Sequence, residues 1–171
     1  MIRKRNAILR SPEWVIIGIG ANLGAPRVMI ETALKELSEI AMNEVVCSSI
    51  WKSEASGMDG DDFANAVAKF EFNESPHNLL GKLQSIEAKY GRAPDHGHHT
   101  PRTLDLDIIA FGDQQISEVN LCIPHPHAAQ RLFVLLPLRE VDPNFRFFDQ
   151  PKSLDELIER AERLRIEKWE D

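Results

Sequence analysis

The chain lacks the cysteine pattern of a disulfide-rich or zinc-binding protein. It contains only two cysteines, Cys47 and Cys122, which stand far apart and outside any CxxC or Cys/His spacing. A disulfide framework or a zinc ribbon needs more cysteines or a closer spacing, so neither is indicated. We therefore expect reduced thiols and a cytoplasmic protein.

Long apolar runs and basic charge are also missing. No stretch approaches the roughly 18 apolar residues that a membrane span requires, and the first ten residues, MIRKRNAILR, lack the apolar core of a signal peptide. The formal net charge is -7, whereas binding to a nucleic-acid backbone needs a basic surface. We expect no membrane and no nucleic-acid partner, so any anion site must be a local basic cluster.

The remaining composition is that of an ordinary globular protein, with 43% hydrophobic and 27% charged residues among 171. A chain of this length buries roughly two thirds of its unfolded surface, which is enough for one domain with a core. We predict a flexible N-terminal extension over residues 1–12, a single domain over residues 13–171, and a monomer.

The spacing of apolar residues predicts an α+β fold. Runs of β-branched and aromatic residues indicate strands, and apolar residues at helical spacing after Ser or Pro indicate helices. The predicted order is strand 14–20, helix 26–42, strand 43–54, loop 55–62, strand 63–72, helix 76–90, loop 92–101 and strand 102–112. This βαββαβ order favours a ferredoxin-like sandwich, in which an antiparallel sheet carries both helices on one face. Helices over 128–141 and 154–164 are C-terminal helical additions.

The stretch PRTLDLDIIAFG places two carboxylates inside a predicted strand. Residues two apart on a strand share a face, so Asp105 and Asp107 point one way and Ile108 points the other. Paired carboxylates can hold a hard cation such as Mg²⁺, which leaves other coordination positions to water and phosphate oxygens. A solvated sheet face would also explain them. Because Arg102 lies three residues before Asp105, we predict a site for a metal-bound polyphosphate.

The same stretch resembles the signature of the 6-hydroxymethyl-7,8-dihydropterin pyrophosphokinase family of folate biosynthesis. Four flanking segments agree with that family in unbroken order: GIGANLG, FANAV, IEAKYGR and IPHPHAAQRLFVLLPL. The resemblance covers about residues 15–138 and implies the ferredoxin-like α+β fold. It also implies transfer of the β,γ-diphosphate of ATP to the hydroxymethyl group of the dihydropterin, with AMP as the second product.

The resemblance further implies roles for individual residues. Two Mg²⁺ ions are expected on Asp105 and Asp107, and the expected catalytic residues are Arg92, Arg102, Asp105 and Asp107. Pterin binding is expected at Gly20, Asn22, Ser53, Phe63, Asn65 and Phe133, where the two phenylalanines would stack on the ring and the asparagine would read its edge. For the phenylalanines core packing is the alternative, and for the residues near Gly20 an ordinary turn. ATP binding is expected at Glu87, Arg92, His98, Arg102, Ile108, His125 and Arg131.

The loop before the signature departs from the family pattern. The family commonly reads GRxRxxRWGPR, whereas this chain reads GRAPDHGHHTPR, with Pro94, His98 and His99 in place of two arginines and the tryptophan. Histidine is mostly neutral at pH 7, so the loop carries less fixed positive charge. A slower enzyme, a relative with an altered donor or substrate, and a non-catalytic pterin- or nucleotide-binding protein stay open. A metal-binding protein is a further alternative, built on His96, His98, His99, His125 and His127.

Overall fold

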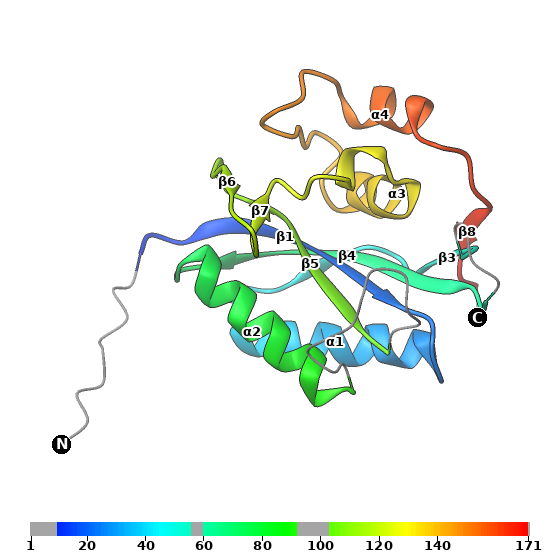
Figure 1. The fold of residues 1–171 in the computed structure, drawn as a ribbon, viewed down its shortest axis with the longest axis horizontal. Coiled ribbons are helices and arrows are strands. Elements are labelled where there is room, and N and C mark those ends of the chain that lie inside the picture. The colour runs from blue at the N-terminus through cyan, green and yellow to red at the C-terminus, as the bar shows by residue number, and fades with distance from the viewer. Residues whose placement is uncertain (1–9, 56–59, 92–102, 171) are drawn as a thin grey trace.

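A central antiparallel sheet carries helices on both faces (Figure 1). The computed structural model describes residues 10–55, 60–91 and 103–170. The elements in chain order are β1 (Glu13–Ala21), α1 (Pro26–Ile40), β2 (Val46–Cys47), β3 (Trp51–Ser53), β4 (Phe63–Phe72), α2 (Pro76–Lys89), β5 (Asp105–Phe111), β6 (Ile116–Ser117), β7 (Cys122–Ile123), a 3-10 turn (Ala128–Gln130), α3 (Leu132–Val141), α4 (Leu154–Arg160) and β8 (Ile166–Lys168).

The sheet order is β5-β1-β4-β3-β8, with β2 also paired to β4, while β6 and β7 form a separate hairpin. Figure 1 shows α1 and α2 on one face of the sheet and α3 and α4 on the other. The prediction of a ferredoxin-like α+β sandwich with C-terminal helical additions is confirmed. Within the described part of the chain, no helix combines the length and apolar character needed to cross a membrane.

Alternation along β1 divides the core into two clusters. Val15, Ile17 and Ile19 are fully or almost fully buried in the cluster that α1 and α2 cover. Ile16 faces the other way and packs in the cluster that α3 and α4 cover. Because successive side chains on a strand point to opposite faces, Gly18 and Gly20 lie on the same face as Ile16.

The predicted helix starts agree with the structure. The Ser75 side chain accepts a hydrogen bond from the backbone N–H of Asn78, and Pro76 is the first residue of α2. Gly91, which follows α2, has φ of 95°, a left-handed conformation that glycine adopts without steric strain. Ser153 and Glu156 form a complete capping box at the start of α4.

Three predicted elements are wrong in their extent. The strand predicted over 43–54 is two short strands, β2 and β3. The helix predicted over 128–141 is interrupted by Arg131, whose backbone is extended, with φ of -110° and ψ of 114°. The C-terminal helix ends at Arg160, and β8 beyond it pairs with β3. Pairing between segments so distant in the chain leaves no local periodicity by which it could be predicted.

Residues 1–9, which form most of the predicted flexible extension, lie outside the described residues. Arg10 is described, and its backbone N–H donates to the Asn73 carbonyl at 2.9 Å. The described residues from Glu13 onward form a six-stranded sheet with a core on each face, together with the separate β6–β7 hairpin. The division of the chain at residue 12 stays a prediction.

Candidate active site

Two glycines on β1, Gly18 and Gly20, separate the carboxylates of β5 from the polar residues of β4. Gly20 lies opposite Asp105 on one side and Asn65 on the other, and Gly18 lies opposite Asp107. Residues directly opposite in an antiparallel pair share a face, so these side chains lie on the α3 side of the sheet. Asp105 and Asn65 are two strand spacings apart, about 10 Å. Because the residue of β1 between them is Gly20, no side chain of β1 separates Asp105 from Asn65.

A β-bulge follows the carboxylates on β5. The register with β1 shifts between Ile16 and Ile17, so that Ile109 and Ala110 both pack in the α3 cluster, whereas Ile108 is in the opposite cluster. Asp105 and Asp107 lie on the α3 side before the bulge and Ala110 lies there after it, so the bulge changes which side chains of β5 face α3. Because the Ile108 side chain is only 5% exposed in the opposite core, any contact with ATP would have to come from its main chain.

His125 stands beside the carboxylate pair. Its backbone N–H donates to the Ile109 carbonyl at 3.0 Å, which ties the segment after β7 to β5. Its ring Nε2 lies 4.0 Å from Oδ2 of Asp107, which is too far for a hydrogen bond. The backbone N–H of His127 donates to Nδ1 of the same ring at 3.2 Å. Nδ1 is therefore the acceptor, and the neutral ring carries its proton on Nε2, toward Asp107.

The charge state of His125 follows from the same surroundings. Burial, with further contributions from the positive charge of Arg131 and from His127, lowers the pKa of the His125 ring to about 4, although Asp105 opposes the shift. The imidazole is neutral at pH 7 and can act there as an N–H donor. The structure thus brings Asp105, Asp107, His125 and Arg131 together.

Arg131 joins this group through its position before α3. It precedes the helix, and its guanidinium lies 5.6 Å from the ring centre of Phe133. A cation at this distance from an aromatic ring is attracted by the π electrons, which restricts the arginine side chain. Phe133 is half-buried and packs against the α3 cluster. The predicted phosphate contact and one predicted pterin contact are therefore neighbours.

Glu87 on α2 acts on the main chain of β5. Its carboxylate Oε1 accepts a hydrogen bond of 2.7 Å from the backbone N–H of Leu106, the residue between the two aspartates. Glu87 is only 5% exposed, and β5 is an edge strand, so this contact satisfies an N–H that no strand pairs. The predicted role of Glu87 at ATP stays a prediction. A structural contact could have been predicted from the sequence, because Glu87 lies four residues after Leu83 and therefore on the buried face of α2.

Asn65 on β4 is held by three acceptors. Its side-chain nitrogen donates to the Ser53 hydroxyl oxygen at 2.9 Å and lies 3.5 Å from the Trp51 carbonyl and 3.4 Å from the Phe63 carbonyl. Carbonyl oxygens only accept, so the nitrogen must face them and Oδ1 must face away. No described residue donates to Oδ1, and a Cβ added at Gly20 would lie 3.9 Å from it. A buried asparagine thus presents an acceptor beside the glycines of β1.

The other predicted pterin residues lie on or next to the same part of the sheet. Phe63 begins β4, is half-buried, and shares a face with Asn65. Ser53 is buried directly opposite Phe63, at the end of β3. Asn22 follows β1 and is 5% exposed. The family resemblance implied these residues, and their role at the pterin stays a prediction. The Trp51 carbonyl was missed, because the register of β3 against β4 is not visible in the sequence.

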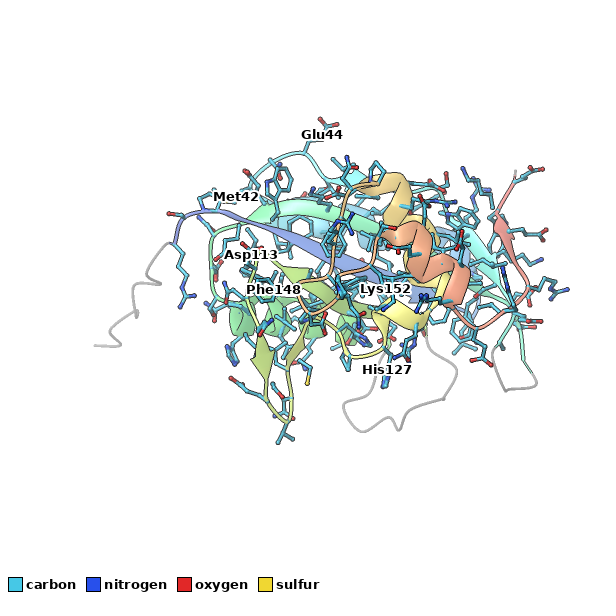
Figure 2. All side chains as sticks on the ribbon, turned by 90° about the horizontal axis from the view of Figure 1, so that it is seen from above. Met42, Glu44, Asp113, His127, Phe148 and Lys152 are labelled. Atoms are coloured by element: carbon cyan, nitrogen blue, oxygen red, sulfur yellow. The ribbon has the colours of Figure 1, made fainter. Side chains whose placement is uncertain are left out.

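Part of the predicted site lies outside the described residues. Arg92, His98 and Arg102 belong to this part, as do His96 and His99 of the alternative metal site. Among the residues that the structure describes, no group of three or more His, Cys, Asp and Glu side chains is arranged to hold a metal ion. Figure 2 shows His127 at the edge of the molecule, pointing outward, and this residue is exposed.

The fold and the site define an α+β sandwich with a carboxylate pair, a neutral histidine and an arginine on one face of its sheet. Residues 16–143 match the family described as 7,8-dihydro-6-hydroxymethylpterin-pyrophosphokinase, or HPPK. The chain belongs to this family. It is a diphosphotransferase of folate biosynthesis, and ATP is the family's co-substrate.

Individual relatives agree with this assignment. A 2-amino-4-hydroxy-6-hydroxymethyldihydropteridine pyrophosphokinase of Synechocystis is 38% identical over 148 residues, which cover 86% of this chain and 75% of the relative. The protein of the same name from Pseudomonas aeruginosa is 38% identical over 146 residues, covering 84% of this chain and 89% of the relative. That of Haemophilus influenzae is 41% identical over 127 residues, covering 73% and 79%.

Solved structures share the fold. The crystal structure of wild-type Plasmodium falciparum HPPK-DHPS with pteroate superimposes with a TM-score of 0.70 at 13% identity. The match covers 87% of this chain and 42% of that chain, so this chain spans less than half the length of the HPPK-DHPS protein.

Proposed function

We propose that this chain transfers the β,γ-diphosphate of ATP to the hydroxymethyl group of 6-hydroxymethyl-7,8-dihydropterin and releases AMP. The observation that carries the proposal is the register of β1, in which Gly20 separates Asp105 from Asn65. The carboxylates suited to a polyphosphate and the amide suited to a pterin edge therefore share one face, about 10 Å apart. That interval suits two substrates that meet between β5 and β4.

Asp105 and Asp107 are the residues that would hold Mg²⁺, and two ions are expected. The donor set fits, because Mg²⁺ takes one or two protein carboxylates and fills its other positions with water and phosphate oxygens. When bound, Mg²⁺ would offset the charge of the phosphate oxygens and favour in-line displacement at the β-phosphorus. Glu87 supports this arrangement by holding the main chain of β5 at Leu106, 2.7 Å from its carboxylate oxygen.

The phosphate chain would also meet donors from the segment between β7 and α3. Arg131 would bind phosphate oxygens through its guanidinium, whose planar fork of N–H donors suits bidentate contact with phosphate. His125 is neutral at pH 7, with its pKa lowered to about 4 mainly by burial, and would donate from Nε2. Arg92, His98 and Arg102, outside the described residues, are proposed as further phosphate contacts.

The pterin would bind on the β4 side of the glycines. Phe63 and Phe133 would stack on the two faces of its ring, an arrangement that adds about 0.5–1.5 kcal/mol per aromatic pair beyond burial. Asn65 would accept a hydrogen bond from the N–H edge of the pterin through Oδ1. Gly20, Asn22 and the main chain at Ser53 would complete this part of the site.

We also infer that the enzyme acts in the cytoplasm as a monomer, without a nucleic-acid or membrane partner. The net charge of -7 and the absence of a cysteine framework support this setting.

An assay of the two possible nucleotide products tests the proposal. The chain is incubated with ATP, Mg²⁺ and 6-hydroxymethyl-7,8-dihydropterin, and AMP and ADP are separated by chromatography. The proposal predicts AMP and pterin diphosphate in equal amounts, and neither when one substrate is omitted. Formation of ADP would indicate transfer of a single phosphate, and binding of both substrates without AMP would indicate a non-catalytic relative.

A further inference from the structure

The C-terminal strand β8 lies beyond the residues that match the family, which end at residue 143. It pairs antiparallel with β3, and Ile166 stands directly opposite Ser53. Figure 1 shows β8 beside β3 at the edge of the sheet. A segment outside the family match thus adjoins the strand that carries one of the proposed pterin residues.

Arg165, which precedes β8, binds both ends of the connection between β3 and β4. On the β3 side, its carbonyl accepts from the Glu54 backbone N–H at 3.0 Å, and its own N–H donates to Glu54 Oε1 at 2.8 Å. On the β4 side, its guanidinium nitrogen Nη2 donates to the two carboxylate oxygens of Asp62 at 3.1 and 3.3 Å. One residue therefore links the end of β3 to the start of β4.

Asp62 is shared between two cations. Besides Arg165, its Oδ2 lies 3.5 Å from the Lys52 ammonium on β3. The Asp62 side chain is 24% exposed, the Lys52 side chain 41% and the Arg165 side chain 69%. An isolated ion pair at such exposure contributes little to stability. A network of ion pairs holds the chain more firmly when the same residue also makes backbone hydrogen bonds.

The residues that this network fixes are next to the proposed pterin contacts. Glu54 follows Ser53, Asp62 precedes Phe63, and Ser53 and Phe63 are partners in the sheet. The Ser53 hydroxyl and the Phe63 carbonyl are two of the three acceptors that orient the Asn65 amide. A shift of either strand end would therefore move the amide as well as the Phe63 ring.

We propose that Arg165 is a positioning residue for the pterin side of the site, acting through Glu54 and Asp62. The inference rests on the proposed function, since it concerns affinity for the pterin. Arg165 acts on strand ends rather than on the phosphates, so its loss weakens pterin binding and leaves ATP binding unchanged. The dihydropterin is uncharged at neutral pH, so a change in its affinity reports geometry rather than attraction between charges.

The test compares Arg165→Ala with Arg163→Ala in the full chain. Arg163 is an exposed arginine two residues earlier, so its replacement removes the same charge and serves as the matched control. Dissociation constants are measured by fluorescence titration with 6-hydroxymethylpterin and, separately, with a non-hydrolysable ATP analogue. Thermal midpoints are recorded for each variant.

The expected result is a three- to tenfold weaker pterin affinity for Arg165→Ala, with the ATP-analogue affinity and the thermal midpoint unchanged. Arg165→Lys should recover part of the loss, because it keeps the positive charge beside Asp62, whereas both variants keep the backbone contacts with Glu54. Asp62→Asn should weaken pterin binding as well, and the double variant should lose less than the product of the two single effects. In 1 M NaCl the wild type should approach Arg165→Ala, because salt screens the exposed pair.

Two results would overturn the inference. One is a pterin affinity of Arg165→Ala equal to that of Arg163→Ala. The other is a parallel loss of pterin affinity, ATP affinity and thermal midpoint, which would give Arg165 a general structural role. In either case a wild type that binds the pterin and releases AMP would leave the proposed function intact, whereas a wild type that does neither would contradict both.

Discussion

The side-chain nitrogen of Asn65 lies 2.9 Å from the hydroxyl oxygen of Ser53, across the pair of strands β3 and β4. The carbonyls of Trp51 and Phe63 lie near the same nitrogen, at 3.5 and 3.4 Å. All three contacts engage the donor end of the amide and leave its oxygen turned toward the glycines of β1. The hydrogen bond from Asn65 to Ser53 therefore determines that a ligand beside β1 meets the amide oxygen of Asn65 and not its nitrogen.

Replacing the hydroxyl tests this relationship. Ser53→Ala should raise the KM for the dihydropterin about two- to tenfold, since a net hydrogen bond contributes about 0.5–1.5 kcal/mol and the two carbonyls still hold the nitrogen. The KM for ATP should stay constant, and Ser53→Thr should behave like the wild type. Steady-state kinetics with each substrate varied in turn measure the effect, with Ser117→Ala, at an exposed serine, as the control. Equal changes in both KM values would contradict the assignment.

Side chains introduced on β1 should obstruct the site without unfolding the sheet. At Gly20 a Cβ would meet only Asn65 Oδ1, at an ordinary 3.9 Å. Gly20→Val should therefore fold, since β-branched residues suit strands. It should lower pterin affinity at least about tenfold, because its side chain would occupy space at contact distance from the Asn65 oxygen that the pterin would meet. Gly18→Ala is the comparison, because its Cβ would lie 3.1 Å from Ile109 Cδ1 and should affect packing more than binding. Titration calorimetry and thermal unfolding separate the two outcomes.

Glu87 should prove important for the carboxylate pair through its hydrogen bond to the main chain of Leu106, the residue between the two aspartates. Glu87→Ala leaves the buried N–H of Leu106 without its acceptor, at a cost of about 1–3 kcal/mol in the free energy of unfolding. Glu87→Gln retains an acceptor oxygen and should lose less. We expect Glu87→Ala also to require more Mg²⁺ for half-maximal AMP release. Wild-type Mg²⁺ dependence in that variant would argue against a positioning role.

The capping box of α4 should make the C-terminal part of the chain sensitive to acid. The Ser153 backbone N–H donates to the Glu156 carboxylate at 2.8 Å, and this hydrogen bond lowers the pKa of Glu156 below its usual value. A carboxyl whose pKa is lower in the folded state stabilises the fold above its ordinary pKa of 4.5, and this contribution is lost as the pH falls through the lowered value. Glu156→Gln should therefore show a smaller loss of stability between pH 6 and pH 3 in urea unfolding. An identical pH dependence would rule out this contribution.

One prediction concerns the histidines before the signature and rests on the sequence alone. If fixed positive charge limits turnover, His98→Arg should raise kcat/KM for ATP more at pH 8 than at pH 6, because histidine with an ordinary pKa near ~6.5 is partly protonated at the lower pH. His77→Arg, at an exposed position on α2, is a suitable control. The same gain at both pH values would contradict the charge argument.

Local patterns in the sequence carried much of the fold. Runs of β-branched and aromatic residues predicted β1 and β4, and Ser75 and Ser153 marked the helix starts that the structure shows. Strand geometry alone also predicts that Asp105 and Asp107 lie on the same face of the sheet.

Contacts between distant segments could not be predicted in this way. The pairing of β8 with β3 joins residues more than 100 positions apart, and no periodicity marks it. The proton position on His125 depends on a backbone N–H two residues later, in a turn whose geometry the sequence does not determine. The hydrogen bond from Asn65 to Ser53 needs the register of β3 against β4, which depends on the connection between them.

The most direct measurement of the central claim is the Mg²⁺-dependent release of AMP by Asp105→Ala, with Asp113→Ala as the control. Asp113 is an exposed aspartate in the turn just after β5 and lies outside the proposed site. The account predicts that the wild type and Asp113→Ala release AMP only when ATP, Mg²⁺ and the dihydropterin are all present. Asp105→Ala should release less than about a hundredth as much, since loss of a metal ligand should cost more than the roughly 10–100-fold loss typical of a residue that only supports a ligand. Undiminished AMP release by Asp105→Ala would contradict the assignment of this carboxylate pair as the catalytic centre.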